Sequence, residues 1–203
     1  MPRKHCRDMP QNHWRSLPPP AAAAALALLL AGSPLWPQEQ LQLVPTRDVD
    51  ISYDITRPRQ PAIRERVRWL VGERLERIDG PDKSVTILDR KRDEITLLTP
   101  ATRTYWKFAG APRRPTEPEQ NAVLSRGGEA VVSGQRCTEW SWKQEAETRT
   151  LCATADGVAL RLVVDGKTVM EARSVSYGRQ DAALFEVPSD YAPALAPEGG
   201  AAQ

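Results

Sequence analysis

The sequence predicts a mainly β protein built on a mostly antiparallel sheet. Apolar and polar residues alternate with a period of two in many short runs, which is typical of half-buried strands. Asp-Gly pairs and other turn residues separate the runs, and no segment keeps a helical period. We therefore expect about ten or eleven short strands, paired mainly with their neighbours in sequence.

Residues 1–36 predict a secretory signal peptide. Four basic residues precede an uncharged run of eleven apolar residues, 21–31, which is shorter than the roughly 20 residues that a membrane-spanning helix needs. Small residues follow at 31–33, as a cleavage site requires, although Pro34 comes directly after them. The alternatives are a disordered Ala/Pro-rich tail and an uncleaved leader that anchors the protein in a membrane. Export would place the protein in the periplasm.

Removal of this leader changes the chemistry available to the protein. His5 and His13 are the only histidines and both lie in the leader, so a cleaved chain has no histidine for catalysis or zinc binding. The whole chain has 28 Lys+Arg and 26 Asp+Glu, and the leader holds four and one of these, so the remainder carries 24 and 25, a net charge of −1. This balance gives no reason to expect a nucleic-acid partner. Membrane contact is expected only through an uncleaved leader.

Residues 37–192 predict one domain, and its first strands are the clearest. Val49, Ile51, Tyr53 and Ile55 alternate with polar residues, which predicts a strand with one buried face. The next run, 63–71, places Arg64, Arg66 and Arg68 on one face. Two interpretations fit these arginines: a site for an anion or an acidic partner, or a solvated face neutralised by acidic residues of a neighbouring strand. The second is the simpler.

Weaker alternation follows at 85–87 and 95–97, and Trp106 and Phe108 share a face of the run 104–108. Val158, Leu160, Leu162 and Val164 share a face, and Val169, Val175 and Tyr177 are expected on one face of the next run together with Glu171 and Arg173. Asp165-Gly166 separates these last two runs and predicts a tight hairpin.

Two short helices are expected between the strands. Thr116 and Glu119 have the spacing of a capping box, and Gly127-Gly128 would end the helix that follows. Asp181 is a candidate cap for a helical turn at 182–185. Residues 193–203 are rich in Ala, Pro and Gly, and we expect a disordered tail there.

Cys137 and Cys152 are the two cysteines that remain after the leader, and an even number in an exported chain favours a disulfide. If they are directly opposed in a hairpin, the same register opposes Ser141 to Thr148, and the loop is 143–146. Trp140, Trp142 and Leu151 then share the opposite face, with Arg149 across from Trp140. Redox chemistry is the alternative for such a pair, but the wide spacing favours a structural bond.

Four tryptophans are the candidate ligand-binding residues: Trp69, Trp106, Trp140 and Trp142. They either line a ligand cavity or fill the core of a sheet that has few other aromatic residues. A Ca²⁺-loop pattern begins at Asp48 but lacks the required Gly and Glu, since Tyr53 and Arg59 stand at those positions. No nucleophile, phosphate-loop or dinucleotide motif appears, so we expect no catalytic residues, no metal, no cofactor and no enzymatic activity.

Several stretches together resemble a family of exported bacterial proteins of uncharacterised function that is related to the LolA-like lipoprotein-carrier fold. They are Val44–Tyr53, Gly134–Trp140 with its Cys-Thr-x-Trp strand, Cys152–Leu160 and the closing Phe185–Tyr191. The resemblance implies a strongly curved antiparallel sheet, an incomplete barrel, with one or two short helices across its concave face. In the carriers the enclosed apolar cavity accepts acyl chains. No motif here marks a true lipoprotein carrier, and no ligand-contacting residue is carried over.

Three functions remain open. The first is a periplasmic protein that binds a lipid or other apolar ligand in a half-barrel cavity, lined by several of the tryptophans. The second is a non-enzymatic envelope module with a filled core, whose arginine face or free sheet edge meets a protein partner. The third is an enzyme that uses carboxylates alone, which requires two carboxylates converging in a cleft.

Overall fold

The protein is described here from a computed structural model, which describes residues 40–110 and 113–194. These residues belong to the compact unit Glu39–Gln203. The predicted signal peptide, 1–36, and residues 195–203 of the predicted tail lie outside the described residues.

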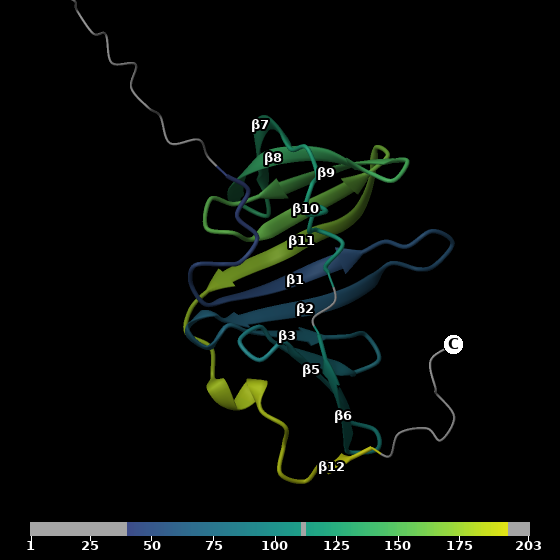
Figure 1. The fold of residues 1–203 in the computed structure, drawn as a ribbon, viewed down its shortest axis with the longest axis vertical. Helices are drawn as coiled ribbons and strands as arrows, with labels where there is room; N and C mark the ends of the chain where they lie inside the picture. The colour runs from purple at the N-terminus through teal and green to yellow at the C-terminus, as the bar shows by residue number, and fades with distance from the viewer. Residues whose placement is uncertain (1–39, 111–112, 195–203) are drawn as a thin grey trace, which may run out of the picture. The chain divides into compact units, whose positions relative to one another are not determined.

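One twelve-stranded sheet runs through the described part of the chain, in the order β12-β6-β5-β4-β3-β2-β1-β11-β10-β9-β8-β7 (Figure 1). All pairings are antiparallel except that of β12 with β6, so the predicted fold class is confirmed. The strands are β1 Val49–Ile55, β2 Ile63–Leu70, β3 Leu75–Asp79, β4 Val85–Asp89, β5 Glu94–Thr99, β6 Thr104–Ala109, β7 Ser125–Val132, β8 Gln135–Gln144, β9 Glu147–Ala153, β10 Ala159–Val164, β11 Lys167–Tyr177 and β12 Ala192–Pro193.

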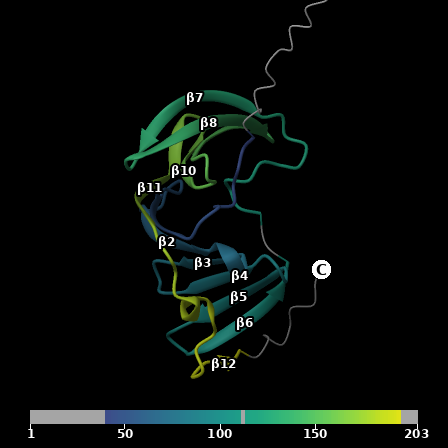
Figure 2. The same cartoon turned by 90° about the vertical axis from the view of Figure 1, so that its left-hand side faces the viewer.

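The sheet curves, as the side view in Figure 2 shows. One face, called here the pocket face, carries Ile51, Tyr53, Val67 and Trp69. The opposite face of β3–β6 is covered by the segment after β11, where Val187 and Tyr191 pack on a cluster of Val85, Ile87 and Leu98. The sheet therefore has apolar contacts on both faces at this end.

The N-terminal and C-terminal halves of the sheet meet where β1 pairs with β11, Val49 lying opposite Tyr177. Val49 and Ile51 are at most 1% exposed, which confirms the alternation predicted for this strand. On the other face of β2, Arg66 pairs with Asp50 and Arg64 with Asp54, while Arg68 contacts both Asp50 and Asp79. The arginine face is thus neutralised by neighbouring strands.

The alternation of buried and exposed side chains predicted for β11 is interrupted within the strand. Ile51 lies opposite Val175, but Tyr53 lies opposite Ala172, so Arg173 is the extra residue of a bulge. Because a bulge reverses the alternation, Ala172 is buried with Val175 and Tyr177, and Arg173 is exposed. The prediction that Glu171 and Arg173 share the face of Val175 and Tyr177 is therefore wrong.

No α-helix occurs among the described residues, and two 3₁₀ turns take its place: Val71–Glu73 and Ala182–Phe185. The cap predicted at Asp181 is confirmed, because its carboxylate accepts from the amide of Ala183 at 3.0 Å. The helix predicted from Thr116 is wrong. Pro118 offers no amide, and it restricts the backbone of the residue before it, so the segment forms isolated turns. No described helix has the length and apolar character needed to cross a membrane.

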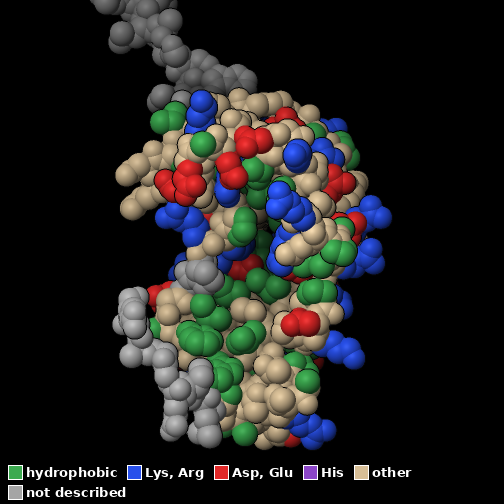
Figure 3. All heavy atoms as spheres, turned by 90° about the vertical axis from the view of Figure 1, so that its right-hand side faces the viewer, with side chains coloured by type: hydrophobic (Ala, Val, Ile, Leu, Met, Phe, Trp, Pro, Cys, Tyr) green, Lys and Arg blue, Asp and Glu red, His purple; other side chains and the backbone are tan. Residues whose placement is uncertain are grey.

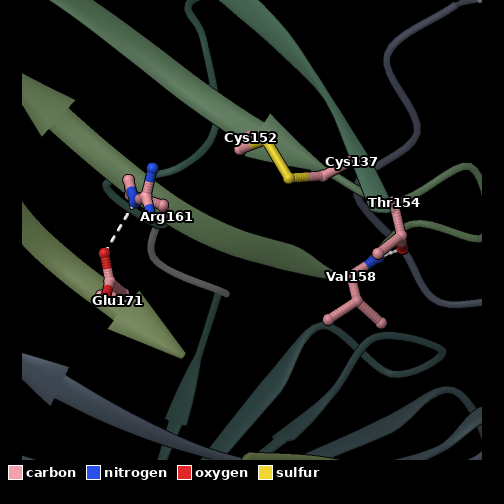
Figure 4. Close-up of a disulfide and its surroundings, with 6 residues drawn as sticks. All are labelled: Cys137, Cys152, Thr154, Val158, Arg161 and Glu171. Atoms are coloured by element: carbon pink, nitrogen blue, oxygen red, sulfur yellow. Dashed lines mark hydrogen bonds and ion pairs between the residues drawn. A yellow bond between two sulfur atoms is a disulfide. The ribbon is translucent and has the colours of Figure 1, made fainter. Parts of the chain in front are cut away.

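The hairpin of β8 and β9 carries the Cys137–Cys152 disulfide, with a Cα–Cα distance of 5.3 Å (Figure 4). Its register differs from the prediction by two residues, because Cys152 lies opposite Glu139 and Arg149 opposite Trp142. The strands extend further than predicted and leave a two-residue turn, in which Glu145 has a φ of 54°. An even shift keeps every side chain on its predicted face, so Ser141 still shares the disulfide's face and is hydrogen-bonded to Thr150 at 2.9 Å.

Candidate ligand pocket

The pocket face holds a hollow of about 440 Å³. Its walls come from β1, β2, β3, β9, β10 and β11 and from the connection between β6 and β7, and most of them are apolar: Ile51, Ile55, Val67, Trp69, Ile78, Pro115, Val158, Leu162, Val164, Val169 and Met170. Figure 3 shows hydrophobic side chains gathered in the middle and lower part of one side of the molecule, with Lys and Arg side chains mainly above them and along one edge. The volume lies within the range of about 300–1,000 Å³ found for small-molecule sites.

A buried ionic cluster closes one side of the hollow. The Glu76 side chain is only 2% exposed, and its carboxylate lies 2.8 Å from Arg90 and 3.5 Å from Arg114. Both guanidinium groups also lie over the indole of Trp69, at 5.4 and 5.0 Å from the ring centroid. A buried carboxylate requires such partners, because an unpaired charge in an apolar interior is costly. The cluster therefore fixes the position of Trp69 in the pocket wall.

The same cluster holds the connection between β6 and β7 over the pocket face. This connection, residues 113–122, is called here the strap. Arg114 pairs with Glu117 at 2.8 Å and donates to the carbonyl of Leu43 at 2.9 Å. From the other side Arg149 donates to the carbonyl of Pro115 at 3.1 Å. The strap is thus fastened at both sides of the hollow, and Pro115 and Thr116 form part of its wall.

Polar groups in the pocket wall are few and mostly paired within the protein. The Tyr53 hydroxyl donates to the carbonyl of Ala159 at 2.7 Å, and burial raises the pKa of Tyr53 well above its usual value. Arg149 pairs with Glu147 at 2.8 Å and Arg57 with Glu65 at 3.7 Å. The exception is the Nε atom of Arg149, which is buried without a hydrogen-bond partner.

A second cluster fastens the segment before β1 beside the pocket. Asp156 accepts from Arg47 at 2.9 Å, from the Thr154 hydroxyl at 2.6 Å and from the Tyr177 hydroxyl at 3.1 Å. Burial by itself raises the pKa of Asp156, but these hydrogen bonds and the Arg47 charge outweigh it, so the pKa is lowered. Gly157 has a φ of 95°, and a Cβ there would lie 2.4 Å from the carbonyl oxygen of Val44. Only glycine fits this close approach.

Of the four tryptophans proposed from the sequence, Trp69 lines the hollow. Trp106 lies on β6 and stacks on Phe108, with ring centroids 6.4 Å apart. Trp140 and Trp142 are 7% and 3% exposed, and Trp142 packs with Leu151 and Leu162 in a core cluster. The structure does not bring the four together, and ligand contact by any of them stays a prediction.

The sequence reasoning missed most residues of the pocket wall. Ile51, Tyr53 and Val67 alternate in strands that the sequence marks clearly, but their pattern identifies only a buried face. Arg114 and Arg149 carried no signal for a role at the pocket. Within 40–110 and 113–194, no group of three or more His, Cys, Asp or Glu side chains is placed to hold a metal ion.

The fold and pocket define a class of protein: a curved, mostly antiparallel sheet with an open hollow on one face and a strap across it. Neither a protein-family model nor a curated protein matches the sequence. Among solved structures, an uncharacterised conserved protein from Thermus thermophilus is similar, with a TM-score of 0.54 and 15% identity over 73% of this chain and 90% of that one.

MucB is also similar, with a TM-score of 0.53 and 13% identity over 74% of this chain. The MucA/MucB complex of Pseudomonas aeruginosa matches with a TM-score of 0.52 and 13% identity over 72% of this chain. The chain spans 60% and 57% of the lengths of these two matched chains. At such identities the likeness establishes a shared fold and nothing further.

Proposed function

We propose that this is a non-enzymatic periplasmic protein that binds one lipid or other apolar ligand in the hollow of the pocket face. The observation that carries this proposal is the hollow itself, about 440 Å³ of space that side chains leave open on a mainly apolar wall. A filled core, which the competing interaction module requires, would leave no such space. Protein interiors are otherwise close-packed, so an apolar hollow of this size is the kind of site that takes a small apolar ligand.

The pocket wall favours a ligand with an uncharged apolar chain and one polar end. Glu76, Arg114, Glu147 and Arg57 in the wall all have charged partners within the protein, so the net charge offered to a ligand is small. The Nε atom of Arg149 is a buried donor that lacks an acceptor. The Arg149 side chain as a whole is 18% exposed in the wall, so its exposed guanidinium atoms, rather than Nε, would meet the ester or carboxyl oxygen of an acyl chain.

Periplasmic location is supported by two features of different kinds. Residues 1–36 have the pattern of a signal peptide. The Cys137–Cys152 disulfide belongs to an oxidising compartment, because disulfides persist there and are reduced in the cytosol.

The first test is native mass spectrometry of the mature protein purified from the periplasm, next to a denatured sample. We expect one apolar ligand that is retained in the native state and released on denaturation. In a titration of the delipidated protein with fatty acids of increasing length, Kd should fall about fourfold per added methylene until the hollow is full, since each buried methylene contributes about 0.8 kcal/mol. A Kd that does not depend on chain length would refute the pocket.

Val67→Phe fills part of the hollow from β2 without adding a charge. We expect it to weaken fatty-acid binding about fifteenfold, the equivalent of roughly two methylenes of lost contact. The matched control is Arg64→Phe, on the same strand, whose side chain is 70% exposed on the opposite face. Equal loss of binding in both variants would show that the hollow is not the site.

A further inference from the structure

Strand β7 is an edge strand of the sheet that the described residues form. Among the described residues no strand pairs with the outer side of β7, which lies at one end of the strand order (Figure 2). Its first five residues are all exposed. Val131 is 64% exposed, and Leu124, directly before the strand, is 37% exposed. An edge strand with exposed apolar side chains is a template for another strand.

A bulge in β7 places the side chains of Arg126 and Glu129 on the same face of the sheet. Arg126 lies opposite Trp140 and Glu129 opposite Thr138, so Gly127 and Gly128 together face the single residue Glu139. Because a bulge reverses the alternation, Arg126 and Glu129 point to the same face although they are three residues apart. In an unbulged strand they would point to opposite faces.

This arrangement satisfies the geometry of a two-fold axis. Two antiparallel copies of one strand, related by an axis perpendicular to the sheet, oppose residues that must lie on the same face. With the axis between Gly127 and Gly128, Arg126 meets Glu129 of the other copy and Glu129 meets Arg126. The same register opposes Leu124 to Val131 on that face. Opposite charges and apolar residues across a ladder are both favourable pairs.

We propose that two copies of this protein associate through β7, antiparallel and in the register that opposes Arg126 to Glu129, so that the two sheets become continuous. The contact involves one short strand from each copy and is small beside the roughly 1,600 Å² of a standard interface. We therefore expect a reversible dimer that dissociates on dilution.

The test is sedimentation velocity of the mature, delipidated protein across a dilution series. Arg126→Glu and Glu129→Arg should each raise the dimer dissociation constant about tenfold, because each turns two attractive pairs into repulsive ones. The double variant R126E/E129R restores both pairs with no change in net charge, and its dissociation constant should return to that of the natural protein. Unchanged thermal unfolding of the dilute variants is the control for folding.

A cross-link tests the register directly. Leu124→Cys combined with Val131→Cys should give a covalent dimer under mild oxidation. Each single variant should not, because only the pair of different positions is opposed. Seven residues of extended strand keep these two positions about 23 Å apart within one copy, too far for an internal disulfide. A monomer at every concentration, or a dimer that charge reversal leaves unaffected, would overturn the proposal. Neither outcome bears on ligand binding in the hollow, which V67F tests separately.

Discussion

Acidic side chains in this protein act mainly by neutralising arginines. Asp50 contacts both Arg66 and Arg68, and Asp156 ties Arg47 to Tyr177. Burial by itself raises the pKa of Asp50, but hydrogen bonding and the charges of Arg66 and Arg68 outweigh it and lower the pKa. The pKa of Asp156 is lowered for the same kind of reason. These two carboxylates therefore link the stability of the fold to pH.

We predict that the protein loses stability in acid through these two residues. A carboxyl whose folded pKa lies below its unfolded value of about 3.9 binds fewer protons in the folded state, so it stabilises the fold above pH ~4. That contribution is lost as the pH falls through the folded pKa. The measurement is the free energy of unfolding in urea at a series of pH values from neutral down to pH ~2. At neutral pH the natural protein should be more stable than either Asp50→Asn or Asp156→Asn.

The difference between each variant and the natural protein should shrink as the pH falls below about 4, where the natural carboxyls become protonated. A difference that stays constant from neutral to acid pH would mean that these groups stabilise the fold by packing or hydrogen bonding alone.

The strap and the β8–β9 hairpin show how single elements are fixed by contacts outside themselves. The strap has no regular structure, and its place depends on Arg114, Arg149 and the buried Glu76. In the hairpin the disulfide adds a covalent tie between strands that already pair from Thr138 to Gln144. Both cysteines are at most 3% exposed and pack in the core with Val132 and Ala172.

We predict that replacing both cysteines by alanine lowers the free energy of unfolding by about 3 kcal/mol, the chain-entropy value for a loop of about 15 residues. The Cys137→Ala/Cys152→Ala variant is compared with the natural protein by guanidinium unfolding, with and without a reductant. Reductant should destabilise the natural protein and leave the double variant unchanged. If the natural protein is equally stable in both conditions, the disulfide adds nothing to the fold.

The sheet as a whole is joined at its centre by strands from distant parts of the sequence. β1 lies between β2, its neighbour in sequence, and β11, more than a hundred residues away. Several of the most deeply buried residues lie there and in the adjoining β10, among them Val49, Ile51, Leu160 and Ala172 at 0–1% exposure. The two ends of the order, β12 and β7, each pair on one side only among the described strands.

We predict that amide hydrogen exchange follows this order. Amides of β1 and β11 should exchange most slowly, through global unfolding, and those of β12 and β7 fastest, through local opening. The measurement uses protein dilute enough to keep the proposed β7 pairing dissociated. Slow exchange confined to the β8–β9 hairpin would instead show that the disulfide-linked part is the stable unit.

The fold class, the strands β1 and β2, the Asp165-Gly166 hairpin and the cap at Asp181 follow from the sequence because they depend on local patterns. Alternation, turn residues and capping act within a few residues, so one sequence contains their whole cause. The bulge at Arg173 was not predictable, because it arises from pairing with β1, far away in the chain.

The pocket was the least predictable part, and of the proposed site residues only Trp69 lies in its wall. The sequence alone determined that this chain makes a β sheet with one strongly apolar face and a balanced charge. Only the tertiary structure decided that the strap crosses that face and that Glu76 meets Arg90 and Arg114 beneath it. The reason is physical: a strand pattern depends on neighbours in sequence, whereas a hollow depends on how well surfaces from many strands fill the space between them.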